Sequence, residues 1–295
     1  MLTLSERSFP TLKSLYFYRM NRREFLGGLS AAVIISACGA VARAATAEHF
    51  ARKTRLRFAI GSDWHYGEPN TPYEQYFNDL KAAFSKVQAQ TPCEFFVLNG
   101  DVIHNDPAFL QPAAQLFQTI HPKVFATRGN HDRVTPEAWQ QAWGNPLQHE
   151  QVINGTVLLF GDTSNIKGDF LAPDLQWFEE RLEANKKAKA IFIFIHITPV
   201  KWTEFAADSP AFAALLRKYP NVKAVFNGHD HDQDNVKLLD NKLPFLFDSH
   251  IGGSWGTKYH GFRIVELKDD GSLLTYMMNP DTRINEFDSK KSLAG

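Results

Sequence analysis

Eight side chains in this sequence are candidate metal ligands or proton donors, and they fall in five short segments. They are Asp63 and His65, Asp101, Asn130 and His131, His196, and His229 and His231. Carboxylate, amide and imidazole groups without a thiolate are typical ligands of zinc, manganese or iron, and not of a structural zinc finger. Any single histidine is more simply interpreted as a surface or core residue. Recurrence in five segments favours a metal site.

Each of these segments follows a short apolar run. The runs are 56–60, 95–98, 124–127, 191–195 and 222–226. Apolar runs of this length that stop at Gly, Asn or Asp are typical of buried strands. We therefore expect five strands, each of which presents its polar residues at the carboxyl end.

The remaining segments predict the rest of the fold. Helical spacing or helix-start residues predict helices at 73–90, 107–120, 136–143, 172–187 and 209–219. Strands that alternate with helices pair in parallel, with the helices on the faces of the sheet. Asn154-Gly155 predicts a hairpin over 151–160, and further strands are predicted at 236–239, 245–247, 262–267 and 273–276. We expect an α/β fold of two packed mixed β-sheets flanked by helices.

Two pairs of candidate ligands are separated by one residue. Side chains of a strand alternate between its faces, so Asp63 and His65 would lie on the same side of an extended segment. The same argument applies to His229 and His231. Each pair is therefore expected to converge on one ion.

The order of these motifs resembles the calcineurin-like metallophosphoesterase superfamily. Asp-x-His, Gly-Asp, Gly-Asn-His-Asp, a single His and Gly-His-x-His occur in that order between Asp63 and His231. Within the superfamily the chain is most similar to bacterial cyclic-nucleotide-phosphodiesterase-like members. Purple acid phosphatases carry a tyrosine ligand three residues after the Gly-Asp aspartate. His104 occupies that position here, so an iron–tyrosinate chromophore is not expected.

The resemblance implies a role for each motif residue. Two transition-metal ions (iron, manganese or zinc) would be held, the first by Asp63, His65 and His231, the second by Asn130, His196 and His229, with Asp101 bridging both. A hydroxide between the ions would attack phosphorus. His131 would protonate the leaving group, with Asp132 orienting it, or would instead only bind the phosphate.

The implied activity is hydrolysis of a small-molecule phosphodiester or phosphomonoester. A broad-specificity phosphomonoesterase or nucleotidase is one alternative, and a non-catalytic envelope protein that binds metal or phosphate is another. The glycine-rich segment 252–256 could border the cleft, with Trp255 or Tyr259 near a substrate base. It could equally be an ordinary loop between strands.

The first 47 residues are predicted to be a leader, followed by one folded domain over 48–279 and a polar tail over 280–295. Arg22-Arg23 before Phe25-Leu26 and an apolar stretch resembles a twin-arginine export signal. Met20 is then the expected first residue of the translated protein. Cleavage near residue 44 or 47 would leave a soluble periplasmic enzyme, whereas a lipobox over 35–38 would leave Cys38 lipidated and attach the protein to a membrane.

The distribution of charged residues indicates which binding partners to expect. Residues 1–44 hold six of the 32 basic and two of the 32 acidic residues, so the remainder has a net charge of −4. No basic stripe is present, and a stable polynucleotide partner is therefore not expected. The expected partners are the phosphoester substrate and the twin-arginine export machinery.

Overall fold

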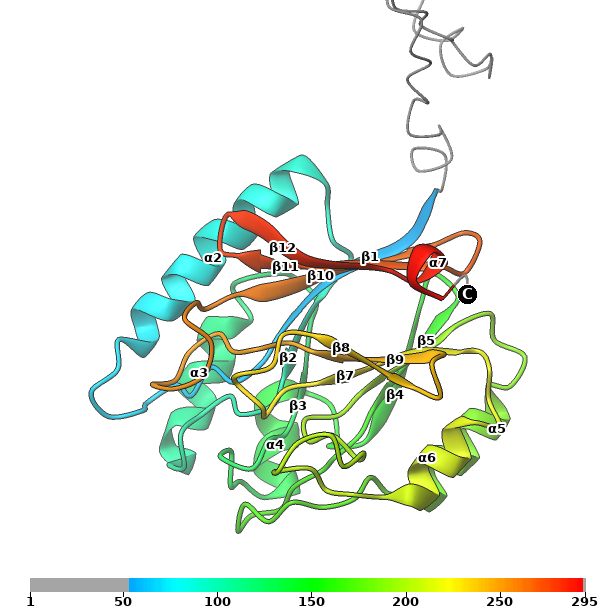
Figure 1. Ribbon diagram of the computed structural model, residues 1–295. Helices are drawn as coiled ribbons and strands as arrows, with labels where there is room; N and C mark the ends of the chain where they lie inside the picture. The colour runs from blue at the N-terminus through cyan, green and yellow to red at the C-terminus, as the bar shows by residue number, and fades with distance from the viewer. Residues whose placement is uncertain (1–52, 294–295) are drawn as a thin grey trace, which may run out of the picture. The chain divides into compact units, whose positions relative to one another are not determined.

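The structure is a computed structural model that describes residues 53–293 (Figure 1). The predicted leader, with the paired arginines, Cys38 and both cleavage positions, lies outside the described residues. Among the described helices, none combines the length and the apolar character needed to cross a membrane.

The first of two six-stranded sheets contains the amino-terminal strands. Its strands are β1 (Thr54–Gly61), β2 (Phe96–Asn99), β3 (Val124–Thr127), β10 (Phe262–Lys268), β11 (Leu273–Asn279) and β12 (Thr282–Asp288). They are ordered β12-β11-β10-β1-β2-β3. The strands β1, β2 and β3 pair in parallel, and β10 pairs with β1 in antiparallel orientation. The carboxyl ends of β1, β2 and β3 therefore lie at one edge.

The second sheet supplies the remaining predicted metal-site strands. Its strands are β4 (His149–Ile153), β5 (Thr156–Phe160), β6 (Ile191–Phe194), β7 (Val222–Asn227), β8 (Val236–Leu239) and β9 (Leu243–Phe247). The order is β4-β5-β6-β7-β9-β8, with parallel pairing from β5 to β9 and an antiparallel strand at each edge. The predicted hairpin over 151–160 is confirmed by the pairing of β4 with β5.

Helices cover the outer face of each sheet. They are α2 (Tyr73–Gln90), the 3₁₀ turn η1 (Pro107–Phe109), α3 (Leu110–Phe117), α4 (Pro136–Trp143), α5 (Leu175–Ala184) and α6 (Pro210–Leu216). Buried residues of α2, α3 and α4 pack with the first sheet, and those of α5 and α6 pack with the second. A third apolar layer joins the two sheets. The predicted α/β fold of two mixed sheets flanked by helices is confirmed.

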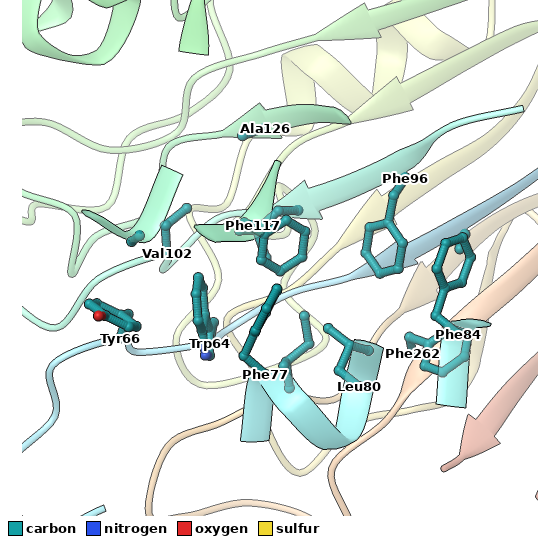
Figure 2. Packing of buried hydrophobic residues seen from close by; sticks show 14 of the residues in the cluster. Trp64, Tyr66, Phe77, Leu80, Phe84, Phe96, Val102, Phe117, Ala126 and Phe262 are labelled. Atoms are coloured by element: carbon teal, nitrogen blue, oxygen red, sulfur yellow. The ribbon is translucent and has the colours of Figure 1, made fainter. Parts of the chain in front are cut away.

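Side-chain alternation along the strands builds these layers. In β1, Phe58 points into the layer between the sheets, whereas its neighbour Ala59 belongs to the layer under the helices. Figure 2 shows the helix layer, where Phe77 of α2 lies against Phe117 of α3 with ring centroids 5.7 Å apart. Rigid packing of this kind fixes where each strand ends, and with it the side chains that follow.

The predicted polar tail over 280–295 is wrong for most of its length. Residues 282–288 form β12, which pairs with β11, and a short helix, α7 (Ser289–Ser292), follows. Most of β12 is exposed because it is an edge strand. It therefore carries no apolar run to reveal it, and the folded domain extends past residue 279.

Candidate metal centre

The eight candidate residues follow the carboxyl ends of β1, β2, β3, β6 and β7. Six of them form two clusters, in each of which the possible ligand atoms lie within 4.8 Å of one another, and His65, His104 and His131 form a third such group. The first cluster is Asp63, His65 and His231; the second cluster is Asp101, His196 and His229. Asn130 and His131 join the second cluster through the backbone, because the His131 N–H donates to Asp101 Oδ1 at 2.7 Å.

The first cluster is fully buried and internally connected. His231 Nε2 lies 3.2 Å from Asp63 Oδ1 and 3.0 Å from His65 Nε2. The Nδ1 atom of His231 faces the carbonyl oxygen of Trp255 at 3.1 Å. A carbonyl only accepts, so Nδ1 carries a proton and Nε2 is directed at the cluster. Burial lowers the pKa of His231, but the neighbouring Asp63 carboxylate outweighs it and raises that pKa.

In the second cluster, a histidine again lies between a backbone carbonyl and a carboxylate, here that of Asp101. His196 Nε2 lies 3.2 Å from Asp101 Oδ2, while its Nδ1 faces the carbonyl oxygen of Asn99 at 2.7 Å. Asp101 Oδ2 is also 3.7 Å from His65 Nε2 in the first cluster. This carboxylate therefore lies between the two clusters.

The backbone at these positions differs from the extended segments that the sequence predicts. Asp63, His65, Asp101 and His229 have positive φ angles of 57°, 52°, 48° and 69°. They lie in turns beyond the strand ends, so strand alternation does not explain how Asp63 and His65 meet. The same argument is wrong for His229 and His231, which belong to different clusters.

Two glycines allow the turns to approach closely. A Cβ at Gly100 would lie 2.2 Å from His196 Nδ1, and one at Gly129 would lie 2.2 Å from Asp101 Oδ1. Any side chain at either position would displace a cluster residue. The glycines of the Gly-Asp and Gly-Asn motifs are therefore required by packing at the site.

The clustered charges shift one another's pKa values. Burial alone would raise the pKa of Asp63, but His231 and His196 lower it to about 2. Burial would lower the pKa of His196, but Asp101 and Asp63 raise it to about 10. Asp63 and Asp101 are thus two ionised carboxylates in a buried site. Their negative charge requires a nearby cation, which is either a protonated His196 or a metal ion.

Buried polar atoms without a hydrogen-bond partner favour a metal ion over a proton as the cation of this site. Asn130 Oδ1 and His229 Nε2 are buried and have no hydrogen-bond partner among the described residues. Burial and the neighbouring His196 lower the pKa of His229 to about 4, which keeps its imidazole neutral at pH 7. An amide oxygen and a neutral imidazole nitrogen without partners are suitable metal ligands. The residues present therefore fit a dinuclear metal site.

His131 and Asp132 are arranged differently from the expectation. Asp132 was expected to orient His131, but its Oδ1 accepts from the Ile103 N–H at 2.9 Å and its Oδ2 from the Gly129 N–H at 2.7 Å. It therefore fixes the turn. His131 Nδ1 is buried and has no hydrogen-bond partner in the described part of the chain, and the ring stacks on His104 with centroids 5.0 Å apart.

Sequence reasoning missed several contacts around the clusters. His65 Nδ1 lies 3.1 Å from His104 Nδ1, although His104 is marked in the sequence only by its place after Asp101. The carbonyl groups of Asn99 and Trp255 leave no trace in a sequence pattern. Of the two predicted cleft aromatics, Trp255 stacks on His231 at 4.2 Å, whereas the Tyr259 hydroxyl donates to Asp234.

A model of the calcineurin-like phosphoesterase family matches residues 56–233, more than half of the chain. The chain belongs to the calcineurin-like phosphoesterase family. Its activity is accordingly that of a metal-dependent phosphoester hydrolase, in agreement with the paired Asp/His clusters. All eight candidate residues lie inside the matched range, whereas Trp255 lies beyond it. The comparison with curated protein sequences gives no match.

Solved structures of this family's fold are similar at low identity. A dimetal phosphatase from Danio rerio is 14% identical, with 80% of this chain and 99% of that chain covered and a TM-score of 0.65. GAP50, described as the anchor in the inner membrane complex of Plasmodium, is 17% identical, with coverages of 80% and 89% and a TM-score of 0.59. The sulfate thiohydrolase SoxB from Thermus thermophilus is 12% identical, with coverages of 82% and 59% and a TM-score of 0.53. These likenesses show the fold alone.

Proposed function

We propose that the protein is an exported, dinuclear metal-dependent hydrolase of small phosphodiesters or phosphomonoesters. Asp63, His65 and His231 would hold one ion, Asn130, His196 and His229 would hold the other, and Asp101 would serve both. The observation that carries the proposal is that two residues assigned to the second ion, Asn130 and His229, each have a buried ligand atom without a hydrogen-bond partner among the described residues. The ions are iron, manganese or zinc, which this mixed oxygen and nitrogen donor set accepts.

The chain's own residues position the reaction. Two bound ions would supply Lewis-acid chemistry, lowering the pKa of a water molecule towards neutral and offsetting charge on the phosphoryl oxygens. Asp101 lies between the clusters, with Oδ2 3.2 Å from His196 Nε2 and 3.7 Å from His65 Nε2, where one carboxylate can serve both ions. The burial of Asp63, His65, Asp101 and His196 strengthens these electrostatic interactions.

His131 is the proposed general acid. Its backbone N–H is fixed to Asp101, its ring lies against His65 and His104, and its Nδ1 has no partner within the described residues. The ring is thus held beside the centre, where an imidazole can transfer a proton to the leaving oxygen. Electrostatic contact with the phosphate is the alternative role.

Substrate scope separates the nearest competing functions. The motif spacing favours the cyclic-nucleotide-phosphodiesterase-like branch, and a broad phosphomonoesterase or nucleotidase is the alternative. A non-catalytic binding protein is a further possibility on this fold, since the similar GAP50 is described as an anchor. The presence of every expected ligand side chain favours turnover over binding alone.

Export by the twin-arginine route is supported by Arg22-Arg23 and the apolar stretch after it. Replacing both arginines with lysine should retain the protein in the cytoplasm, as fractionation and blotting would show. Labelling with radioactive palmitate, with Cys38→Ala as control, decides between the soluble periplasmic form and a lipoprotein.

The decisive test of the enzymatic proposal is reconstitution of the mature protein with each metal. Elemental analysis should give two ions per chain, and a panel of phosphomonoesters and phosphodiesters should reveal the preferred class. Two bound ions with no hydrolysis of any ester would refute the catalytic role and support the binding protein. Fewer than two ions would refute the dinuclear assignment.

A further inference from the structure

Exposed aromatic side chains surround the metal centre. Seven large apolar side chains of the described residues are substantially exposed, and three of these, all aromatic, contact histidines of the two clusters. They are Phe170, Phe205 and Trp255, which are 42%, 52% and 43% exposed. Exposed large apolar groups next to a polar site commonly mark a ligand-binding surface.

Trp255 is fixed against the first cluster. Its indole lies parallel to the His231 ring, with an interplanar angle of 7° and centroids 4.2 Å apart, and its carbonyl oxygen faces His231 Nδ1. A Cβ at Gly256 would lie 2.4 Å from His231 Cβ, so this loop approaches closely because glycine is there. The indole centroid is also 6.1 Å from that of His131. Trp255 therefore lies beside the proposed leaving-group acid.

Phe170 and Phe205 lie against the second cluster. Phe170, from the loop between β5 and α5, meets His229 at 80° with centroids 4.6 Å apart. Phe205, from the loop between β6 and α6, meets the same ring at 86° and 6.0 Å. Three separate loops thus each bring one exposed aromatic ring to the two clusters.

We propose that Phe170, Phe205 and Trp255 form the walls of a subsite that binds a planar aromatic group of the phosphoester substrate. The inference rests on the proposed function and deepens it by naming the substrate class. Rigid aromatic rings stack on any planar π-system and lose little conformational entropy, whereas flexible alkyl groups gain only area burial. A nucleobase and a simple aryl ring share this chemistry.

The first experiment measures binding without turnover, in the metal-reconstituted protein. Benzylphosphonate and cyclohexylmethylphosphonate carry the same anionic group and rings of similar size, but only the first ring is planar. Calorimetry should show benzylphosphonate binding about two- to tenfold more tightly. Equal affinity for the two phosphonates overturns the subsite, whether or not the protein hydrolyses esters.

The second experiment separates a nucleobase from other aryl groups. AMP and ribose 5-phosphate share the scissile ester and differ in the base, and each is assayed as the monoester and as its methyl diester. We expect kcat/KM to be about 5- to 100-fold higher for the nucleotides. If kcat/KM does not distinguish them while benzylphosphonate still binds preferentially, the subsite takes aryl groups and not bases. Hydrolysis of neither ester refutes the proposed function, and the phosphonates still decide the subsite.

Substitutions locate the subsite. Phe170→Ala, Phe205→Ala and Trp255→Leu should each reduce the ratio of benzylphosphonate to cyclohexylmethylphosphonate affinity. Ile166→Ala, in the same loop as Phe170 and 52% exposed, is the matched control and should keep the wild-type ratio. Because each ratio compares two ligands in one preparation, altered metal content largely cancels. A preference that survives all three aromatic substitutions would overturn the assignment.

Discussion

The two clusters of the metal centre hold their side chains in different ways. In the first cluster, His231 lies within 3.2 Å of both Asp63 and His65, so its members contact one another. In the second, Asp101 contacts His196, whereas His229 Nε2 and the neighbouring Asn130 Oδ1 have no hydrogen-bond partner among the described residues. The ligand atoms of His229 and Asn130 are therefore joined to the other ligands by fewer polar contacts than those of the first cluster. The comparison teaches that loss of one residue should spread through the first cluster, whereas loss of His229 should stay local.

The largest expected effect comes from Asp101, which lies between the clusters. Asp101→Ala should remove both ions and reduce kcat/KM by about 10³-fold or more, since several kcal/mol of charge stabilisation is lost. Elemental analysis and ester hydrolysis measure both results. Asp101→Asn is the matched control because asparagine tolerates the positive φ while removing the charge. Full activity in either variant would contradict the proposed centre.

A comparison of one residue from each cluster tests the difference directly. His229→Ala should lose one ion per chain and retain the other, with activity reduced by more than about 100-fold. His65→Ala should lose its ion and also disturb His231 and His104, which both contact its ring. Metal analysis and thermal unfolding distinguish the two variants. Identical metal loss and identical unfolding temperatures would show that the clusters do not differ.

His131 should affect rate without affecting either cluster's ions. His131→Ala should keep two ions and slow turnover by about 10²–10⁴-fold, because proton donation to the leaving oxygen is lost. The slowing should be greatest for alkyl esters, whose leaving groups need the proton most. Equal slowing of nitrophenyl and alkyl phosphodiesters would favour the alternative, electrostatic role.

The smallest effect is expected outside both clusters, at His149 in β4. Burial lowers the pKa of His149 to about 4, and its ring stacks on Phe160 at 4.5 Å. The unfolded chain binds a proton near pH 6.5, whereas the folded chain does not until about pH 4. Its contribution is therefore fully present above pH 6.5 and is lost as the pH falls towards 4.

His149→Phe keeps a flat ring on Phe160 and removes this titration. Between pH 7.5 and pH 5, wild type should lose about 2 kcal/mol more unfolding free energy than the variant. Urea unfolding of both proteins at the two pH values measures the difference. Equal losses would mean that His149 is protonated in the folded protein.

Much of this molecule is predictable from its sequence, because buried strands and their terminal polar residues leave local patterns. The fold class and several elements, including α2, β3 and α4, follow from periodicity and turn residues. The edge strand β12 does not, since its polar, solvent-facing residues lack an apolar pattern. Neither do the roles of Asp132 and His104, because they depend on which backbone groups and rings the turns bring together.

Phe170 and Phe205 of the proposed aromatic subsite are also not predictable from local sequence patterns. Phe170 and Phe205 precede no motif, and nothing local distinguishes them from the other 22 phenylalanines of the chain. Their contact with His229 arises from two loops that follow neighbouring strands of the second sheet, β5 and β6. Proximity of that kind is a property of topology, which residue spacing alone does not encode.

The left-handed turns at Asp63, His65, Asp101 and His229 limit how this centre can change. Each non-glycine residue in that conformation costs roughly 1–3 kcal/mol, and asparagine tolerates it better than alanine or a β-branched residue. An alanine scan therefore measures backbone strain together with the lost ligand. A designer who transplants the centre to another scaffold must reproduce the turns as well as the side chains. Among variants at these positions that still fold, Asn and Gly should be enriched, independently of the requirements of metal binding.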